Sequence, residues 1–282
     1  MKLALVALST LLVVAGSTFA RPSTFVERSL RRGSPGIPTG AAQRLETPST
    51  AAAHSLLSSN WAGVVLVSPP AGENFTEVIG SFTAPTLAPS SYTAASAWVG
   101  IDGWTWRETG LNGLFQAGID FWMEDNELTY DAWYEWYPDT SYNFTGFDIS
   151  SGDVLTFRLV ATSDLEGTIY LENETTGQTA YKVLDAPPSP PFEAPNAEWI
   201  MEDFFSDGQV PLADFGSVST RSCVVACKAD ILHIEHIVFT GASAKTNAGT
   251  IVDLKNGTVI NLTRTDVSID SDSSATIKYL PA

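Results

Sequence analysis

The stretch FQAGIDFW, residues 115–122, alternates between two kinds of side chain, and this alternation decides the fold class. Successive side chains of a strand point to opposite sides of a sheet, so odd and even positions define two faces. The apolar face would consist of Phe115, Ala117, Ile119 and Phe121, and the opposite face of Gln116, Gly118, Asp120 and Trp122. A single strand that is packed on a core is the simplest interpretation.

Three further segments, residues 96–102, 131–137 and 197–203, follow the same rule. Their second faces carry large aromatic side chains interleaved with acids: Trp98 and Asp102, then Asp131, Trp133, Glu135 and Tyr137, then Glu198 and Glu202. An ordinary solvent face would favour Lys, Thr and Ser. A row of this kind indicates a groove that holds an extended ligand. The alternative is a second packing layer with buried polar pairs.

From Ser58 onward, short runs rich in Val, Ile, Thr and aromatic residues are separated by clusters of Gly, Pro, Asn, Asp and Ser. The clearest predicted strands are residues 60–67, 77–83, 154–161 and 251–262. This spacing predicts an all-β fold, an antiparallel β-sandwich of two packed sheets of the concanavalin or jelly-roll kind. The proline-rich run 186–195 is predicted to be a surface connection, because proline cannot pair within a central strand.

The first 54 residues differ from the rest. Residues 1–20 have a basic start, an apolar stretch and a small-residue end, which is typical of a secretory signal. Residues 21–54 contain five arginines and two acids, and Arg31-Arg32 offers a processing site. We interpret this stretch as a basic propeptide, with a disordered tail as the alternative. Residues 55–282 would then form the mature domain.

Charge limits the possible partners and the medium. The 282 residues have a formal net charge of −17, and residues 55–282 alone keep 9 basic and 30 acidic residues, about −21. Such acidity argues against nucleic-acid binding, which needs basic surface. Crowded carboxylates raise one another's pKa values, so we expect greater thermal stability at mildly acid than at neutral pH. The alternative is that the acids serve solubility alone.

No stretch after the signal is long enough to span a membrane, so we predict a secreted protein and expect it to be monomeric. Five Asn-x-Ser/Thr sequons suit a secreted glycoprotein. They begin at Asn74, Asn143, Asn173, Asn256 and Asn261.

The sequence lacks the complete motifs of the common hydrolase active sites. A serine triad needs a histidine, and the predicted mature region offers only His233 and His236, without a G-x-S-x-G elbow. Cys223 and Cys227 favour a disulfide in a secreted chain, although a bridge over five residues requires a turn. His233-x-x-His236 lacks the glutamate and helix of a zinc peptidase, so we predict neither metal nor cofactor. The paired loops of an aspartic peptidase are missing.

A carboxylate and an amide on the groove face remain. A glutamate can act as general base on water. A glutamine N–H can donate to the oxygen that becomes negative in a tetrahedral intermediate. Together they would hydrolyse an amide bond, but these arguments alone do not select Gln116 and Glu198 from the other candidates.

Seven segments decide that choice, because they resemble in order the eqolisins, the fungal glutamic peptidases. They are SSNWAG (58–63), SAWVGIDG (96–103), FQAGIDF (115–121), YDAWYEWYPD (130–139), AEWIMEDF (197–204), LADFG (212–216) and FTGASA (239–244). The resemblance implies a β-sandwich and an acid-active, pepstatin-insensitive endopeptidase that is made with a signal and a propeptide. Its partners would be protein or peptide substrates and its own propeptide.

The resemblance also implies residue roles. The catalytic glutamine falls on Gln116 and the catalytic glutamate on Glu198. The substrate-binding residues fall on Trp98, Asp120, Asp131, Trp133, Glu135 and Tyr137. Without the resemblance, two other functions fit: a jelly-roll glycoside hydrolase that uses Glu135 and Glu198, or a carbohydrate-binding module.

One segment departs from the family pattern. In relatives LADFG is followed within a few residues by FTGASA, whereas here residues 218–238 intervene. One hypothesis is a retained intron, since the run can be written with fungal splice signals. The other is a genuine inserted loop that is closed by Cys223–Cys227.

Overall fold

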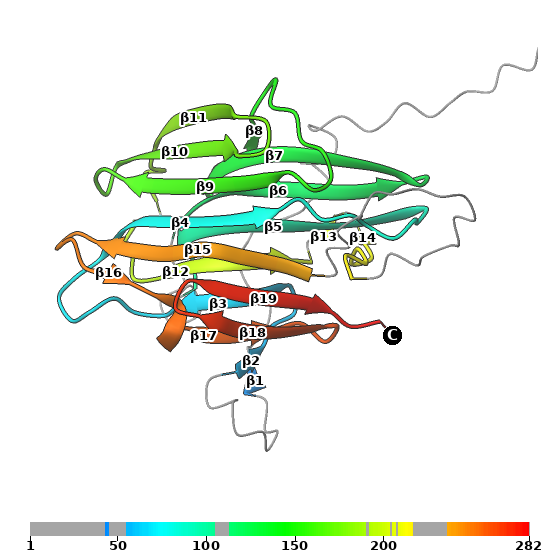
Figure 1. The fold of residues 1–282 in the computed structure, drawn as a ribbon. Helices are drawn as coiled ribbons and strands as arrows, with labels where there is room; N and C mark the ends of the chain where they lie inside the picture. Colours follow the sequence, from blue (N-terminus) through cyan, green and yellow to red (C-terminus); the bar gives the residue numbers. More distant parts are fainter. Residues whose placement is uncertain are drawn as a thin grey trace, which may run out of the picture.

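The protein is a sandwich of two sheets in the computed structural model (Figure 1). The structure describes residues 43–44, 55–104, 113–189, 192–203, 205–206, 208–216 and 236–281. Nearly every pairing between its strands is antiparallel. The predicted all-β sandwich of two packed antiparallel sheets is therefore confirmed.

The first sheet has nine strands, and it contains the four segments that were predicted to line a groove. Its spatial order is β1 (Gln43–Arg44), β2 (Ser55–Leu57), β17 (Thr258–Asn261), β3 (Trp61–Leu66), β12 (Ala197–Glu202), β5 (Tyr92–Asp102), β6 (Leu114–Glu124), β7 (Glu127–Tyr137) and β8 (Tyr142–Asn143). Only the pairing of β2 with β17 is parallel in this sheet.

The second sheet has eight strands and covers one face of the first (Figure 1). Its order is β11 (Gln178–Asp185), β10 (Glu166–Asn173), β9 (Val154–Ala161), β4 (Phe75–Thr83), β15 (His236–Thr246), β19 (Ser274–Tyr279) and β18 (Thr265–Ser271), with β16 (Ile251–Val252) paired to β15. The remaining elements are the hairpin β13 (Phe205–Ser206) and β14 (Gly208–Gln209) and the 3-10 turn η1 (Leu254–Asn256).

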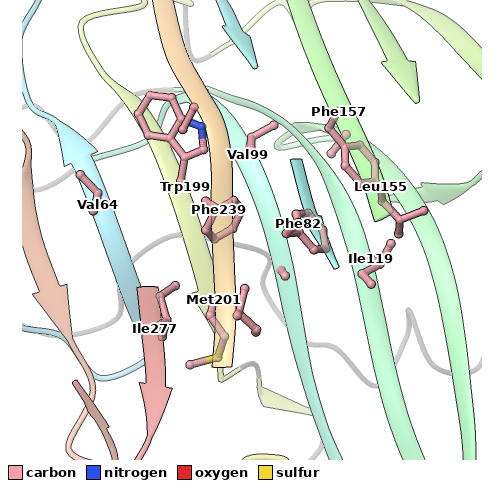
Figure 2. Packing of buried hydrophobic residues seen from close by; sticks show 14 of the residues in the cluster. Val64, Phe82, Val99, Ile119, Leu155, Phe157, Trp199, Met201, Phe239 and Ile277 are labelled. Atoms are coloured by element: carbon pink, nitrogen blue, oxygen red, sulfur yellow. The ribbon is translucent and has the colours of Figure 1, made fainter. Parts of the chain in front are cut away.

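Apolar side chains from both sheets interdigitate between the layers (Figure 2). Phe82 of β4 lies at the centre, with ring centroids 5.8 Å from Phe157 and 5.3 Å from Phe239. The first sheet contributes Val99, Ile119 and other side chains from the positions that alternation predicted. Full burial of each such side chain stabilises the fold by about 1.5–3 kcal/mol relative to exposure.

One hydrogen bond ties the two sheets together beneath the groove. Trp199 of β12 points into the core, and its indole N–H donates to the Ile79 carbonyl of β4 at 2.8 Å. The indole fits because Gly80 has no side chain: a Cβ there would lie 2.7 Å from Trp199 Cδ1. The strand that carries Glu198 is thereby fixed against the opposite layer.

The prediction of one strand over residues 251–262 is wrong. The Asp253 carboxylate accepts a hydrogen bond from the Lys255 N–H, and the Gly257 N–H closes the turn onto the Leu254 carbonyl. The chain therefore crosses between sheets here, with β16 in one and β17 in the other. The Asp and Asn-Gly turn signals outweighed the β-branched composition.

Two connecting segments also differ from expectation. The run 186–195 links β11 to β12 as predicted, but its end is not on the surface, since Ala194 is buried. The predicted insertion 218–238 lies largely outside the described residues, Cys223 and Cys227 included. Its last three residues, 236–238, belong to β15 and pair with β19, and Ile237 is buried between the sheets.

We predict that Gly80→Ala lowers the free energy of unfolding by about 1–3 kcal/mol, because the added methyl group overlaps the Trp199 indole. Chemical denaturation monitored by tryptophan fluorescence measures this change. Thr83→Ala at the end of the same strand is the control and should stay within about 0.5 kcal/mol of the parent. A Gly80→Ala protein of unchanged stability would contradict the packing argument.

Candidate active site

The outer face of the nine-stranded sheet arranges its side chains in rows, because the strands pair in regular register. Glu198 of β12 lies opposite Gly100 of β5, Gly100 opposite Gln116 of β6, and Gln116 opposite Glu135 of β7. These four residues form one line across four strands. They occupy the alternate positions of strands whose other side chains fill the core.

Gly100 leaves the space between Glu198 and Gln116 free of a side chain. A Cβ at Gly100 would lie 2.9 Å from Glu198 Oε1 and 3.1 Å from Leu114 Cδ1 of β6. The Glu198 carboxyl group therefore leans over β5 toward β6, the strand that carries Gln116. Any side chain at position 100 would occupy that path.

Glu135 fixes the orientation of the Gln116 amide. The Gln116 Nε2 donates to Glu135 Oε2 at 2.6 Å, which leaves the amide oxygen turned away from Glu135. Gln116 Oε1 and both carboxyl oxygens of Glu198 are buried and have no hydrogen-bond partner among the described residues. Unpaired buried acceptors cost free energy, and this cost is typical of a site that awaits a ligand or reactant.

Burial governs the protonation of Glu198. Removal from water raises the pKa of this carboxyl well above its ordinary value, and the negative charge of Asp102 raises it further. A strongly shifted carboxyl next to an amide on a sheet face is a candidate general acid or base.

Aromatic side chains form the row beside this line. Ile200 of β12, Trp98 of β5, Gly118 of β6 and Trp133 of β7 lie opposite one another in turn. Gly118 must lack a side chain, since a Cβ would lie 2.4 Å from Trp98 Cβ. The two tryptophans belong to an apolar cluster on the outer face, separate from the core between the sheets.

The next row consists of three acids and one serine: Glu202, Ser96, Asp120 and Asp131. Glu202 accepts a hydrogen bond from Trp98 Nε1 at 2.9 Å, and this bond fixes the indole edge. On the far side of the Gln116 line, Tyr137 lies opposite Leu114. The structure thus brings all eight predicted site residues onto one face.

Sequence reasoning placed Gly100, Asp102 and Glu202 on the correct face but assigned them no part in the site. The sequence did contain a signal for these three residues, because they alternate with core residues in the segments that carry the predicted site. Asn60 was missed, although its Nδ2 contacts Glu202 Oε1 at 3.4 Å. No clustered set of His, Cys, Asp and Glu suited to a metal ion occurs within the described part of the chain.

The peptidase A4 family model matches residues 59–279. Aspergillopepsin-2 of Aspergillus niger is 36% identical over 249 residues, which cover 79% of this chain and 78% of that protein. Scytalidopepsin B of Scytalidium lignicola is 35% identical over 250 residues, covering 85% of this chain and 91% of that protein.

This chain belongs to the peptidase A4 family.

Solved structures of glutamic peptidases superpose on this fold. A scytalidoglutamic peptidase bound to a peptide-based transition-state analogue superposes with a TM-score of 0.62 at 32% identity, covering 79% of this chain and 98% of that chain. The aspergilloglutamic peptidase of Aspergillus niger gives 0.50 at 37% identity, covering 67% and 99%. The resemblance to the eqolisins is confirmed, and the chain is a glutamic-type endopeptidase. The glycoside hydrolase and carbohydrate-binding alternatives therefore give way to a peptidase.

Two of the five glycosylation sequons in this A4 peptidase lie at amides that the fold uses. Asn173 is buried and its Nδ2 donates to Asp153 Oδ2 at 2.8 Å, while Asn261 Nδ2 donates to Ser55 Oγ at 3.1 Å. A glycan on either nitrogen would need open space beside a buried amide, so the structure argues against modification there. Asn74 and Asn256 are exposed and Asn143 is half-buried, and these three remain predictions.

A second acid that is partly withdrawn from water, the half-buried Asp203, follows directly after β12. Burial raises the pKa of Asp203 to about 7, and the neighbouring negative charge of Glu202 adds to this effect, while Arg264 opposes it. With Glu198, this gives two carboxyl groups that the folded state prefers to keep protonated.

We predict a higher melting temperature at pH 5 than at pH 8. A carboxyl whose folded pKa is raised contributes its full stability below its unfolded pKa and loses it as pH rises through the folded value, here about 7 for Asp203. Differential scanning calorimetry across this range measures the loss, and Asp203→Asn should reduce it. The exposed Asp164→Asn is the control and should leave the profile unchanged. A melting temperature that climbs from pH 5 to pH 8 would count against this prediction.

Proposed function

We propose that this A4 peptidase is a secreted acid endopeptidase in which Glu198 activates water and Gln116 stabilises the oxyanion. The observation that carries this proposal is the line of Glu198, Gly100 and Gln116, in which a glycine separates two buried groups with unpaired acceptors. The transition-state analogue and the Ala-Ile-His tripeptide that are bound to related peptidases support a peptide substrate.

The attacking water would lie between the two side chains. Water has two hydrogens, and the site offers two kinds of acceptor for them: the Glu198 carboxylate and the Gln116 amide oxygen. With both hydrogens held, an oxygen lone pair can face the scissile carbonyl of a peptide laid along the aromatic row. This arrangement fixes the nucleophile before reaction.

Glu198 then acts twice. It takes a proton from water as the oxygen attacks the carbonyl carbon, and it returns that proton to the leaving nitrogen as the tetrahedral intermediate collapses. The Gln116 Nε2 carries two hydrogens, of which one is engaged by Glu135. The second can donate to the developing oxyanion. Trp98, Trp133, Tyr137, Asp120 and Asp131 would contact the substrate on either side.

The raised pKa of Glu198 suits this double role. The residue must be ionised to act as base, so activity should fall in strong acid, where Glu198 is fully protonated. A base with an ordinary glutamate pKa would hold the proton less readily and would return it more easily. The raised value shifts the balance toward proton abstraction from water.

The composition of the first 54 residues supports processing of the chain. Residues 21–54 carry five arginines against a strongly acidic remainder, and Arg31-Arg32 offers a cleavage site. We propose that secretion follows the signal at residues 1–20 and that loss of the basic propeptide, residues 21–54, activates a monomeric enzyme. The described residues contain no helix with the length and apolar character of a membrane span.

We expect Glu198→Gln to lower kcat by about 10²–10⁴-fold, the usual contribution of a general base. Gln116→Ala should lower it by about 10²–10³-fold, the usual contribution of one oxyanion donor. Cleavage of acid-denatured protein by the purified, processed enzyme measures both. Asp153→Asn, immediately before β9 of the other sheet, is the folding control. If Glu198→Gln keeps near-parental turnover, the mechanism is wrong.

Gly100→Ala tests the line of residues without removing a reacting group. Its methyl group would lie within 2.9 Å of Glu198 Oε1 and would push the carboxyl away from Gln116. We expect at least a tenfold drop in kcat, with KM less affected, because a small misplacement of a reacting group is costly. Steady-state kinetics on a chromogenic peptide measure the separate effects on kcat and KM. Equal activity of Gly100→Ala and parent enzyme would exclude this geometry.

A further inference from the structure

Asp102, the last residue of β5, is a buried carboxylate that neither contacts the proposed water position nor belongs to the aromatic row. Its Oδ1 accepts from the Gly103 N–H at 2.8 Å, and its Oδ2 accepts from the Glu193 and Ala194 N–H groups at 3.0 and 3.1 Å. A carboxylate that accepts this many backbone N–H bonds is stabilised in its ionised form.

The backbone of Asp102 is held in an uncommon conformation. Its φ is +76°, in the left-handed region, where a non-glycine residue is uncommon and signals a local constraint. Its own N–H donates to the Asn196 carbonyl at 3.1 Å. Hydrogen bonds of the carboxylate and the backbone of Asp102 thus fix residues 193–196, the last residues before β12.

This segment determines where Glu198 lies. Beyond Asp102, the Ala194 carbonyl accepts from the Phe75 N–H at 3.0 Å, and Asn196 Nδ2 donates to the Val67 carbonyl at 3.0 Å. Glu198 follows only two residues after Asn196. The anchors on three sides therefore set the start of β12 and the entry of the catalytic strand into the sheet.

Asp102 is also the diagonal neighbour of Glu198 on the same face. Glu198 lies opposite Gly100, and Asp102 is two positions further along β5. Diagonal pairs on one face are separated by about 7–8 Å or less. Both groups are buried, so little water screens the charge between them.

We propose that Asp102 is a positioning residue for the glutamic peptidase reaction: it anchors the segment that enters β12 and places a fixed negative charge diagonally across from Glu198. This inference rests on the proposed function, since it concerns the base of that mechanism. In agreement with it, the charge of Asp102 raises the pKa of Glu198 beyond the effect of burial.

Other charged groups on this face are farther away in the register. Glu202 lies at the opposite end of β12, and Glu135 lies on β7, three strands away from Glu198. Directly beside Glu198, β3 contributes Val65 and β5 contributes Gly100, both uncharged. Asp102 is thus the acidic side chain nearest to Glu198 in register within the described residues.

The consequence is a base that holds its proton to higher pH. With a neutral residue at position 102, Glu198 should ionise at lower pH, because a like charge no longer opposes its ionisation. The acid limb of the profile of kcat/KM against pH should then move toward acid. A residue that serves the fold alone would lower activity at every pH without moving that limb.

The test is the pH profile of processed Asp102→Asn and of Asp102→Ser, a second neutral variant whose hydroxyl can still accept from the Gly103 N–H. We expect the acid limb to shift by about one pH unit to lower pH in both. Asp153→Asn is the matched control: Asp153 is likewise buried and accepts from the Ser150 N–H and Asn173, but it lies immediately before β9 of the other sheet. It should affect stability without moving the limb.

A second measurement does not depend on turnover. The side-chain carboxyl carbon of Glu198 can be followed by ¹³C NMR and assigned from its absence in Glu198→Gln, and its titration should shift by the same amount in both Asp102 variants. An unmoved titration would overturn the proposal, as would failure of both variants to fold while Asp153→Asn folds. Near-parental activity of Glu198→Gln would instead overturn the proposed function, and the NMR titration distinguishes the two failures.

Discussion

The register of four antiparallel strands is the constraint on which this molecule depends. It places Glu198, Gly100, Gln116 and Glu135 on one line across β12, β5, β6 and β7. Because side chains alternate, a slip of one residue in any of these pairings would turn a reacting group into the core and a core residue outward. The chemistry therefore needs no loop to assemble it and relies on rigid sheet geometry.

The same alternation couples the site to the core. Glu198 lies on the outer face of its sheet, while its neighbour Trp199 packs between the sheets and donates to the Ile79 carbonyl. Large buried side chains hold the register from below, and glycines leave room on the face above. Gly100 and Gly118 lie where a Cβ would collide with Glu198 or Trp98. The site thus lies on a densely packed core, and glycines occupy the positions of its outer face where neighbouring side chains converge.

Buried carboxyl groups give the fold its relation to acid. Glu198 and Asp203 both have raised pKa values because the folded chain withdraws them from water. Such groups stabilise the fold in their protonated form and destabilise it as they ionise. In the proposed mechanism, the environment that makes Glu198 able to take and return a proton also lowers the stability of the fold at neutral pH.

The sequence by itself determined the sandwich, the inward and outward faces of the central strands and, through the eqolisin resemblance, the catalytic candidates Gln116 and Glu198. Alternation is a local property that each strand carries in its own residues. The sequence failed at residues 251–262, where a turn divides an apolar run between two sheets. It also failed to show the roles of Gly100 and Asp102, because a diagonal neighbour or the path of a carboxyl depends on which strands pair and in what register. Only the tertiary structure decides those pairings, since β12 pairs with strands whose residues lie 96 to 141 positions away in the chain, through contacts that no single segment encodes.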